Sequence, residues 1–238
     1  MVKEWGVSPE IGILFGVVFA AALGLLFGLI AIRRQGIYFA MTTLALAQLV
    51  YFIFLQAPFT HGEDGIQGVP RGNLFGLIDL SQPLAIYYVV LAIFLAGMGL
   101  IHRIIHSPFG QVLKAIRENE ARALSLGYDV ARFKLQAFVL SAALAGLAGS
   151  TKSLVFQLAS LTDVEWQMSG EVVLMTLLGG IGTVFGPVAG AFVVSSLANR
   201  LATTQLPVTV VTGAVFILCV LAFRRGIVGE FLHRLARR

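Results

Sequence analysis

The side chains that could carry out covalent or metal chemistry are few in this sequence and scattered along it. A serine nucleophile such as Ser169, which precedes Gly170, needs a base within hydrogen-bonding reach. The only imidazole bases are His61, His102, His106 and His233. The charge pattern described below places His61 on one side of a membrane and the other three on the opposite side. The sequence therefore predicts no catalytic residue, no metal site and no enzyme.

Two glycine-rich stretches lack the features of nucleotide-binding motifs. Residues 149–153 (GSTKS) have neither the Gly-Lys pair nor the preceding strand of a phosphate-binding loop. Residues 180–186 (GIGTVFG) place the last glycine one position too late for a dinucleotide fingerprint, and an apolar run surrounds them. No cofactor is predicted, so any ATP that drives this protein must bind to another chain.

Composition assigns the chain to a class. Of its 238 residues, 58% are hydrophobic and 12% charged, and the mean hydropathy is +0.88. Soluble domains contain about 25% charged residues, and a soluble fold of this size cannot hide so much apolar surface. A soluble enzyme, a disordered chain and a nucleic-acid-binding domain are excluded. The single cysteine, Cys219, cannot form an intrachain disulfide.

Apolar runs predict membrane-spanning helices, because a helix rises about 1.5 Å per residue and the hydrocarbon layer is about 30 Å thick. The runs are 11–32, 37–57, 84–101, 135–156, two within 172–202 divided at 186–187, and 208–223. We expect an all-α, polytopic transmembrane helix bundle formed by one domain, residues 1–238. It has about seven spans, or six plus a re-entrant hairpin, since residues 172–183 are short for a full crossing.

The charges between the runs predict the orientation of the spans. Basic residues gather at 33–34, in the loop 102–134 and in the tail 224–238, whereas the loops 60–83 and 157–171 are acidic. By the positive-inside rule the basic segments are cytoplasmic. The N-terminus then lies outside and the C-terminus inside.

Small and polar residues within the apolar runs each allow two interpretations, one structural and one functional. Glycines four residues apart, as at 12/16 and 24/28, favour close helix packing, and a thin-walled transport path is the alternative. Candidate translocation-path or hinge residues are Thr42, Thr43, Gln48, Gly179, Gly180, Gly182, Gly186 and Pro187. The two threonines can instead bond to their own helix. The cluster of glycines at 179–186, followed by Pro187, indicates either a helix break near a site at the membrane midplane or a plain loop between two spans.

The loop 102–134 contains strong local signals. Ser107–Pro108 predicts a helix start, followed by apolar residues at helical spacing: Phe109, Val112, Leu113 and Ile116. A second short helix is expected from Asn119, with a left-handed cap at Gly127, and Asp129 caps the next helix. The apolar stripe either packs on the bundle itself or inserts into a cytoplasmic partner.

Four blocks of the sequence resemble the branched-chain amino acid permeases of ABC importers, LivM type. They are 36–45 (GIYFAMTTLA), 62–66 (GEDGI), 107–128 (with SPFG, AIRENE and GY) and 179–187 (GGIGTVFGP). They occur in the family's order and extend over most of the chain. Because such permeases carry further N-terminal spans, the resemblance implies a chain shortened at its N-terminus.

The resemblance implies a multi-pass permease subunit in the plasma (inner) membrane of a prokaryote, which translocates branched-chain amino acids by alternating access. The implied partners are a second permease subunit, two cytoplasmic ATP-binding subunits and an extracytoplasmic substrate-binding protein. The residues implied to couple the permease to the ATPase are Glu118, Asn119, Glu120, Ala121, Ala123 and Gly127. An ATP-independent carrier or channel, and a non-translocating assembly subunit, remain as alternatives.

Overall fold

The computed structural model describes residues 6–60, 62–74, 76 and 78–201, and in addition 213, 226, 228 and 229. The chain divides into two compact units, Met1–Val164 and Glu165–Arg238, and each is described by itself. The described part is mainly helical, and its strands contain two residues each. The expected all-α, polytopic class is confirmed, whereas the single domain over 1–238 stays a prediction.

Four described helices are long and apolar enough to cross a membrane: α2 (Pro9–Ala31), α3 (Ile37–Gln56), α4 (Pro83–His106) and α7 (Val130–Phe156). Each coincides with one of the first four apolar runs. The run 208–223 lies outside the described residues, except for Gly213.

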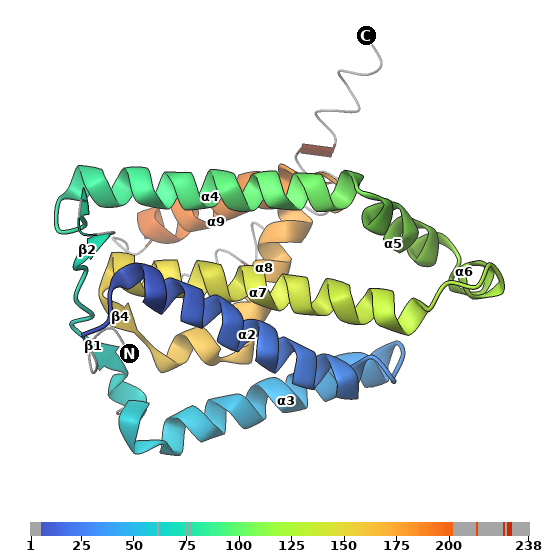
Figure 1. The fold of residues 1–238 in the computed structure, drawn as a ribbon, viewed down its shortest axis with the longest axis horizontal. Helices are drawn as coiled ribbons and strands as arrows, with labels where there is room; N and C mark the ends of the chain where they lie inside the picture. The colour runs from blue at the N-terminus through green and yellow to red at the C-terminus, as the bar shows by residue number, and fades with distance from the viewer. Residues whose placement is uncertain are drawn as a thin grey trace, which may run out of the picture. The chain divides into compact units, whose positions relative to one another are not determined.

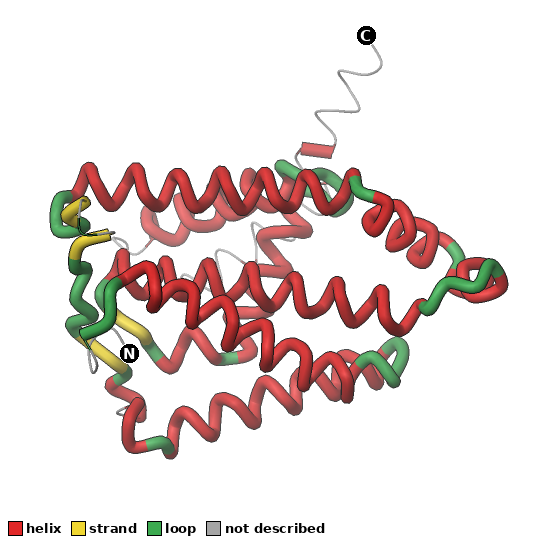
Figure 2. Tube along the Cα trace, viewed as in Figure 1, coloured by secondary structure: helices red, strands yellow, loops and turns green. Residues whose placement is uncertain are grey.

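The first unit places its connecting segments at two opposite ends of these helices (Figures 1 and 2). The turn between α2 and α3 lies at the same end as α5 (Pro108–Glu118) and α6 (Glu120–Ser125). The other end holds η1 (Pro58–Thr60), η2 (Gly62–Asp64), η3 (Leu161–Val164) and the strands β1 (Ile66–Gln67), β2 (Asn73–Leu74), β3 (Ile78–Asp79) and β4 (Leu158–Ala159). The two basic segments of this unit therefore share one end.

Glycines of α2 allow close contact with α7, which lies beside it in Figure 1. A Cβ atom added at Gly24 would lie 2.5 Å from Ala142 Cβ, and one added at Gly28 would lie 2.7 Å from Leu135 Cδ1. Likewise, a Cβ atom added at Gly146 of α7 would lie 2.5 Å from Ala20 Cβ of α2. The packing role expected for Gly24 and Gly28 is confirmed. Gly149 of α7, in contrast, has no atom within 4 Å of its Cβ position.

At the opposite end, backbone contacts join the loop after α3 to the end of α7. β1 pairs with β4 in antiparallel register, Ile66 opposite Ala159. Arg71 donates a hydrogen bond from Nη2 to the Val155 carbonyl at 2.7 Å, where a helix C-terminus favours a cation. These contacts hold the two loops together. Just after β3, the Ser81 backbone N–H donates to the Asp79 carboxylate and lowers its pKa.

The described residues 165–201 of the second unit form the helices α8 (Trp166–Gly179) and α9 (Gly186–Leu201). The sequence divided this stretch at 186–187, but the break lies at residues 180–185 and Gly186 opens α9 with Pro187 in its first turn. Proline is favoured there because the first turn leaves its N–H position unpaired in any case. At about 1.5 Å per residue, the 14 residues of α8 extend about 21 Å, less than a full hydrocarbon layer.

Candidate functional site

The α4–α5 corner begins the element that the sequence singled out. The Ser107 hydroxyl donates to the Ile104 carbonyl at 2.6 Å and accepts the Gly110 N–H at 3.3 Å. Pro108 fits the first turn of α5. A Cβ atom at Gly110 would meet the carbonyls of the preceding helix, Ile104 O at 2.5 Å among them. The helix start expected at Ser107–Pro108 is confirmed, and only glycine fits at 110.

Short-range caps define α6. Asn119 alone separates α5 from α6, and its Oδ1 accepts the Arg122 N–H at 3.0 Å. At the other end Gly127 has φ +85°, its N–H donates to Leu124 O, and the Tyr128 N–H donates to Ala123 O. This pair of bonds is a Schellman motif, which satisfies the last carbonyls of a helix. Both caps expected from the sequence are confirmed.

The apolar stripe of α5 packs within this element. Ile116, Ala123 and Val130 form a buried cluster, with Val112 and Phe133 against it. Phe109 stacks on Phe133 with 5.7 Å between ring centroids. Of the two alternatives for the stripe, packing on its own chain is confirmed. Ala123 is 2% exposed and belongs to this internal cluster, and its expected role in coupling stays a prediction.

One ion pair joins the element to the start of α7, and a second stabilises the N-terminus of α7 itself. Lys134 Nζ lies 2.7 Å from Glu120 Oε1, and both side chains are partly exposed. Asp129 accepts the Arg132 N–H as an N-cap and pairs with the Arg132 guanidinium at 2.7 Å. Glu120 therefore has a partner inside its own chain, which sequence reasoning did not find because the two residues lie 14 positions apart.

The surface that remains for a partner differs from the predicted set. Glu118 and Ala121 are exposed, as a contact with another chain requires. Leu124 and Leu126 are 64% and 71% exposed, at the C-terminal end of α6, which lies at one end of the first unit (Figure 1). Sequence reasoning missed these leucines. Both precede the left-handed cap at Gly127, and neither belongs to the buried cluster that contains Ala123.

The path residues predicted in α3 have local partners. Thr42 Oγ1 donates to Tyr38 O at 2.7 Å and Thr43 Oγ1 donates to Ala40 O at 2.9 Å. The alternative of bonding to their own helix is thus confirmed. Gln48 lines a shallow hollow whose lining residues all belong to α3.

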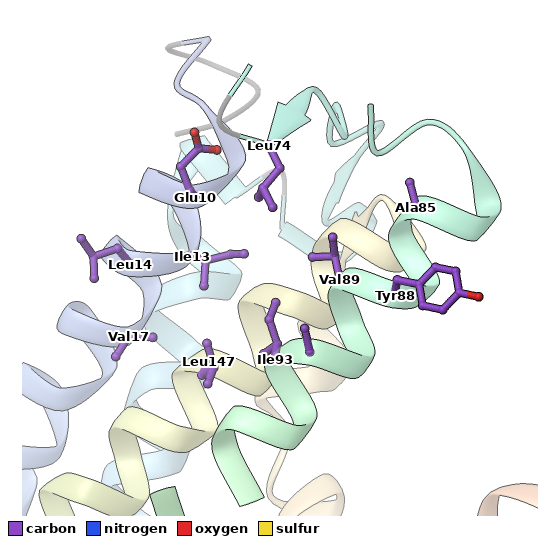
Figure 3. A pocket seen from close by; sticks show the side chains of 11 residues that line it. Glu10, Ile13, Leu14, Val17, Leu74, Ala85, Tyr88, Val89, Ile93 and Leu147 are labelled. Carbon is purple, nitrogen blue, oxygen red and sulfur yellow. The ribbon is translucent and has the colours of Figure 1, made fainter. Parts of the chain in front are cut away.

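A larger hollow lies between α2, α4 and α7 (Figure 3). Its volume is about 740 Å³, and side chains such as Ile13, Val89 and Leu147 line it. Glu10 is the one acidic group at its edge among the described lining residues (Figure 3). A second hollow of about 460 Å³ between α4 and α7 shares Ile93 and Leu147 with the first. None of the predicted path residues lines either hollow.

The glycine cluster of the second unit brings α8 and α9 together. Gly179 faces the Gly186 carbonyl, and Gly190 faces the Met175 carbonyl, too closely for any side chain. Gly180 and Gly182 have φ of +119° and +95°, and so occupy a region that favours glycine. Packing and turn geometry account for these four glycines. The role of Gly179, Gly180, Gly182, Gly186 and Pro187 as a hinge or path stays a prediction.

The described residues contain no group of three or more His, Cys, Asp or Glu placed to hold a metal ion. His102 and His106 are neighbours on α4, with ring centroids 4.2 Å apart, and both are exposed.

Comparison with known proteins gives relatives of one kind. The high-affinity branched-chain amino acid transport system permease protein LivM of Escherichia coli K12 is 30% identical over 210 residues, which cover 79% of this chain and 48% of the relative. The ribose import permease protein RbsC of Bacillus subtilis 168 is 29% identical over 196 residues, covering 76% and 58%. The autoinducer 2 import system permease protein LsrC of Klebsiella pneumoniae is 33% identical over 160 residues, covering 61% and 43%.

The chain spans about half the length of the curated relatives it matches. No solved structure matches it significantly. The relatives are transport permeases, and the four apolar helices agree with a multi-pass membrane protein. The model of the family described as branched-chain amino acid transport system / permease component matches residues 1–223, and the chain therefore belongs to this family.

Proposed function

We propose that the chain is a permease subunit of an ATP-driven ABC importer and that α5 and α6 couple it to the ATPase. The observation that supports this most is the compact α5–α6 element. Its own apolar stripe is buried internally, yet Leu124 and Leu126 remain exposed at the α6 end. A loop that only connected α4 to α7 would not need two capped helices or these exposed leucines.

The orientation and the partners belong to this proposal. The end of the first unit that carries Arg33, Arg34 and α5–α6 faces the cytoplasm, since both segments are basic. The C-terminus is then cytoplasmic and the membrane is the plasma membrane of a prokaryote. Two ATP-binding subunits, a second permease subunit and an extracytoplasmic binding protein complete the importer. Branched-chain amino acids are the proposed substrate, from the family description and the Escherichia coli relative.

The contact surface can be tested by changing Leu126 to glutamate. Leu126 is 71% exposed, so the substitution leaves the internal cluster intact. If the side chain enters an apolar groove of the ATPase, burying a carboxylate there is costly. We expect the tagged Leu126→Glu chain to lose the ATP-binding subunit on purification from its native host in mild detergent, and leucine uptake to fall at least about 100-fold, which corresponds to about 3 kcal/mol.

The matched control is Gln111→Glu, which adds one negative charge to an exposed position of α5. This variant should keep both the ATPase and uptake. A wild-type chain that purifies with no ATP-binding subunit, even after cross-linking through residue 126, would contradict the proposed importer. Loss of binding in both variants would contradict the specific contact at Leu126.

Glu120 offers a test of its own, because its partner lies within the chain. Glu120→Arg places a second cation beside Lys134 and should abolish uptake while the chain still enters the membrane. The double variant Glu120→Lys with Lys134→Glu restores the pair in reverse. We expect it to recover most of the uptake, measured with radiolabelled leucine in cells of matched chain content. No recovery in the double variant would mean that Glu120 itself contacts the ATPase.

A further inference from the structure

Two adjacent arginines follow the first membrane-capable helix of the described chain. Arg33 and Arg34 lie in the turn between α2 and α3, and both side chains are exposed. Neither forms an ion pair with a described residue, whereas Lys134, Arg132 and Lys152 each do. Two uncompensated guanidinium groups thus stand next to each other at the end of α2.

These arginines line an open hollow that also has an apolar wall. Its volume is about 620 Å³, and the lining residues are Leu29, Ile30, Arg33, Arg34 and Thr42. The two aliphatic side chains are 48% and 54% exposed, one turn before the arginines on a membrane-capable helix. No acidic residue lines the hollow, and the first turn of α3 contains none. One site therefore combines two cations with an aliphatic surface below them.

This arrangement matches one kind of ligand. A phosphodiester carries the charge and the oxygen pairs that guanidinium groups bind in a bidentate way. Free phosphate would make no apolar contact with the aliphatic wall, whereas the acyl chains of a phospholipid would pack against it. The basic residues predict that this end of the helices meets the cytoplasmic leaflet, which carries anionic lipid. Arginines that only set the topology of α2 would show no preference among headgroups.

We propose that Arg33 and Arg34 bind the phosphate of an anionic phospholipid whose acyl chains lie along Leu29 and Ile30. The site lies between α2 and α3 and involves neither the α5–α6 element nor the hollow of Figure 3. It rests on the orientation given under the proposed function, but not on transport or on coupling to an ATPase. The ligand class is a phosphatidylglycerol-like lipid with a net negative headgroup.

The test is binding of fluorescent phosphatidylglycerol to the purified full-length chain in mixed micelles, with phosphatidylcholine and inorganic phosphate as competitors. Since a basic residue near an anionic surface contributes about five-fold in affinity, Arg33→Gln with Arg34→Gln should weaken binding about 25-fold, and each single change about five-fold. Arg33→Lys with Arg34→Lys keeps the charges and should retain the preference for phosphatidylglycerol. Inorganic phosphate should not displace the lipid.

The matched control is Arg103→Gln, which removes one exposed cation from the last turn of α4 at the same end of the unit. It should leave phosphatidylglycerol binding within about two-fold of wild type, far less than the effect of either Arg33 or Arg34. Three results would overturn the proposal. They are equal competition by phosphatidylcholine, displacement by inorganic phosphate, and an Arg103→Gln effect as large as that of Arg33→Gln.

Discussion

Replacing Gly127 by valine is expected to abolish leucine uptake and leave the chain in the membrane. Gly127 has φ +85°, a conformation that costs a β-branched residue about 1–2 kcal/mol or more. No atom lies within 4 Å of a Cβ at this position, so the effect arises from the backbone alone. Relaxing that strain breaks the two bonds that end α6, and a helix of six residues does not persist without its caps.

The control is Gly127→Asn, because asparagine tolerates the left-handed region better than any other residue with a side chain. We expect this variant to transport leucine at close to the wild-type rate. Uptake should be compared at equal amounts of membrane-embedded chain, measured by immunoblot of washed membranes. Wild-type uptake by Gly127→Val would show that the geometry at the end of α6 does not matter for transport, and the proposed coupling role would fail.

Local chemistry explains why the α5–α6 element was predictable. Ser107, Asn119, Gly127 and Asp129 each act on backbone groups within five residues, so their roles depend on little beyond the adjacent sequence. The long apolar runs were predictable for a similar reason, since length and hydropathy alone identify a membrane-capable helix. These features required no knowledge of which helix packs on which.

Features that depend on distant contacts were not predictable. The pairing of Glu120 with Lys134 and the burial of Ala123 follow from how α5 and α6 pack on α7. The sequence motif therefore marked residues that build the element, while the leucines exposed on its surface passed unnoticed. Likewise, the break in the second unit was placed at Gly186–Pro187. The close approach of Gly179 to Gly186 moves it to residues 180–185.

The hollow of Figure 3 shows the same limit of sequence reasoning, while the predicted path residues stay a prediction. Polar residues in an apolar run suggested Thr42, Thr43 and Gln48, but both threonine hydroxyls are used by their own helix. That hollow is lined mainly by aliphatic side chains of α2, α4 and α7, whose types do not differ from those of other exposed positions on these helices. The side chains that line the hollow can be told from the others only once the arrangement of these three helices is known.

The second large expected effect concerns the contact between α2 and α7. The two helices approach closely because glycines at this contact carry no side chain. Gly24→Ala places a methyl group 2.5 Å from Ala142 Cβ, which is fixed to the α7 backbone and cannot turn away. The helices must separate locally, which costs about 1–3 kcal/mol. For the purified chain in detergent we expect the melting temperature to fall by about 2–12 °C. Ala142→Gly in the same chain removes the clash and should restore most of the loss.

Two further variants test whether contact geometry, rather than glycine content, causes the effect. Gly149→Ala has no neighbour within 4 Å and should not destabilise the chain, since alanine favours a helix by about 0.5–1 kcal/mol over glycine. Gly146→Ala clashes with Ala20 Cβ and also lies 2.7 Å from the Gly16 carbonyl. Ala20→Gly should therefore rescue it only in part, because the backbone oxygen remains. Equal rescue of both pairs, or no rescue of Gly24→Ala by Ala142→Gly, would contradict the close pairing of α2 with α7.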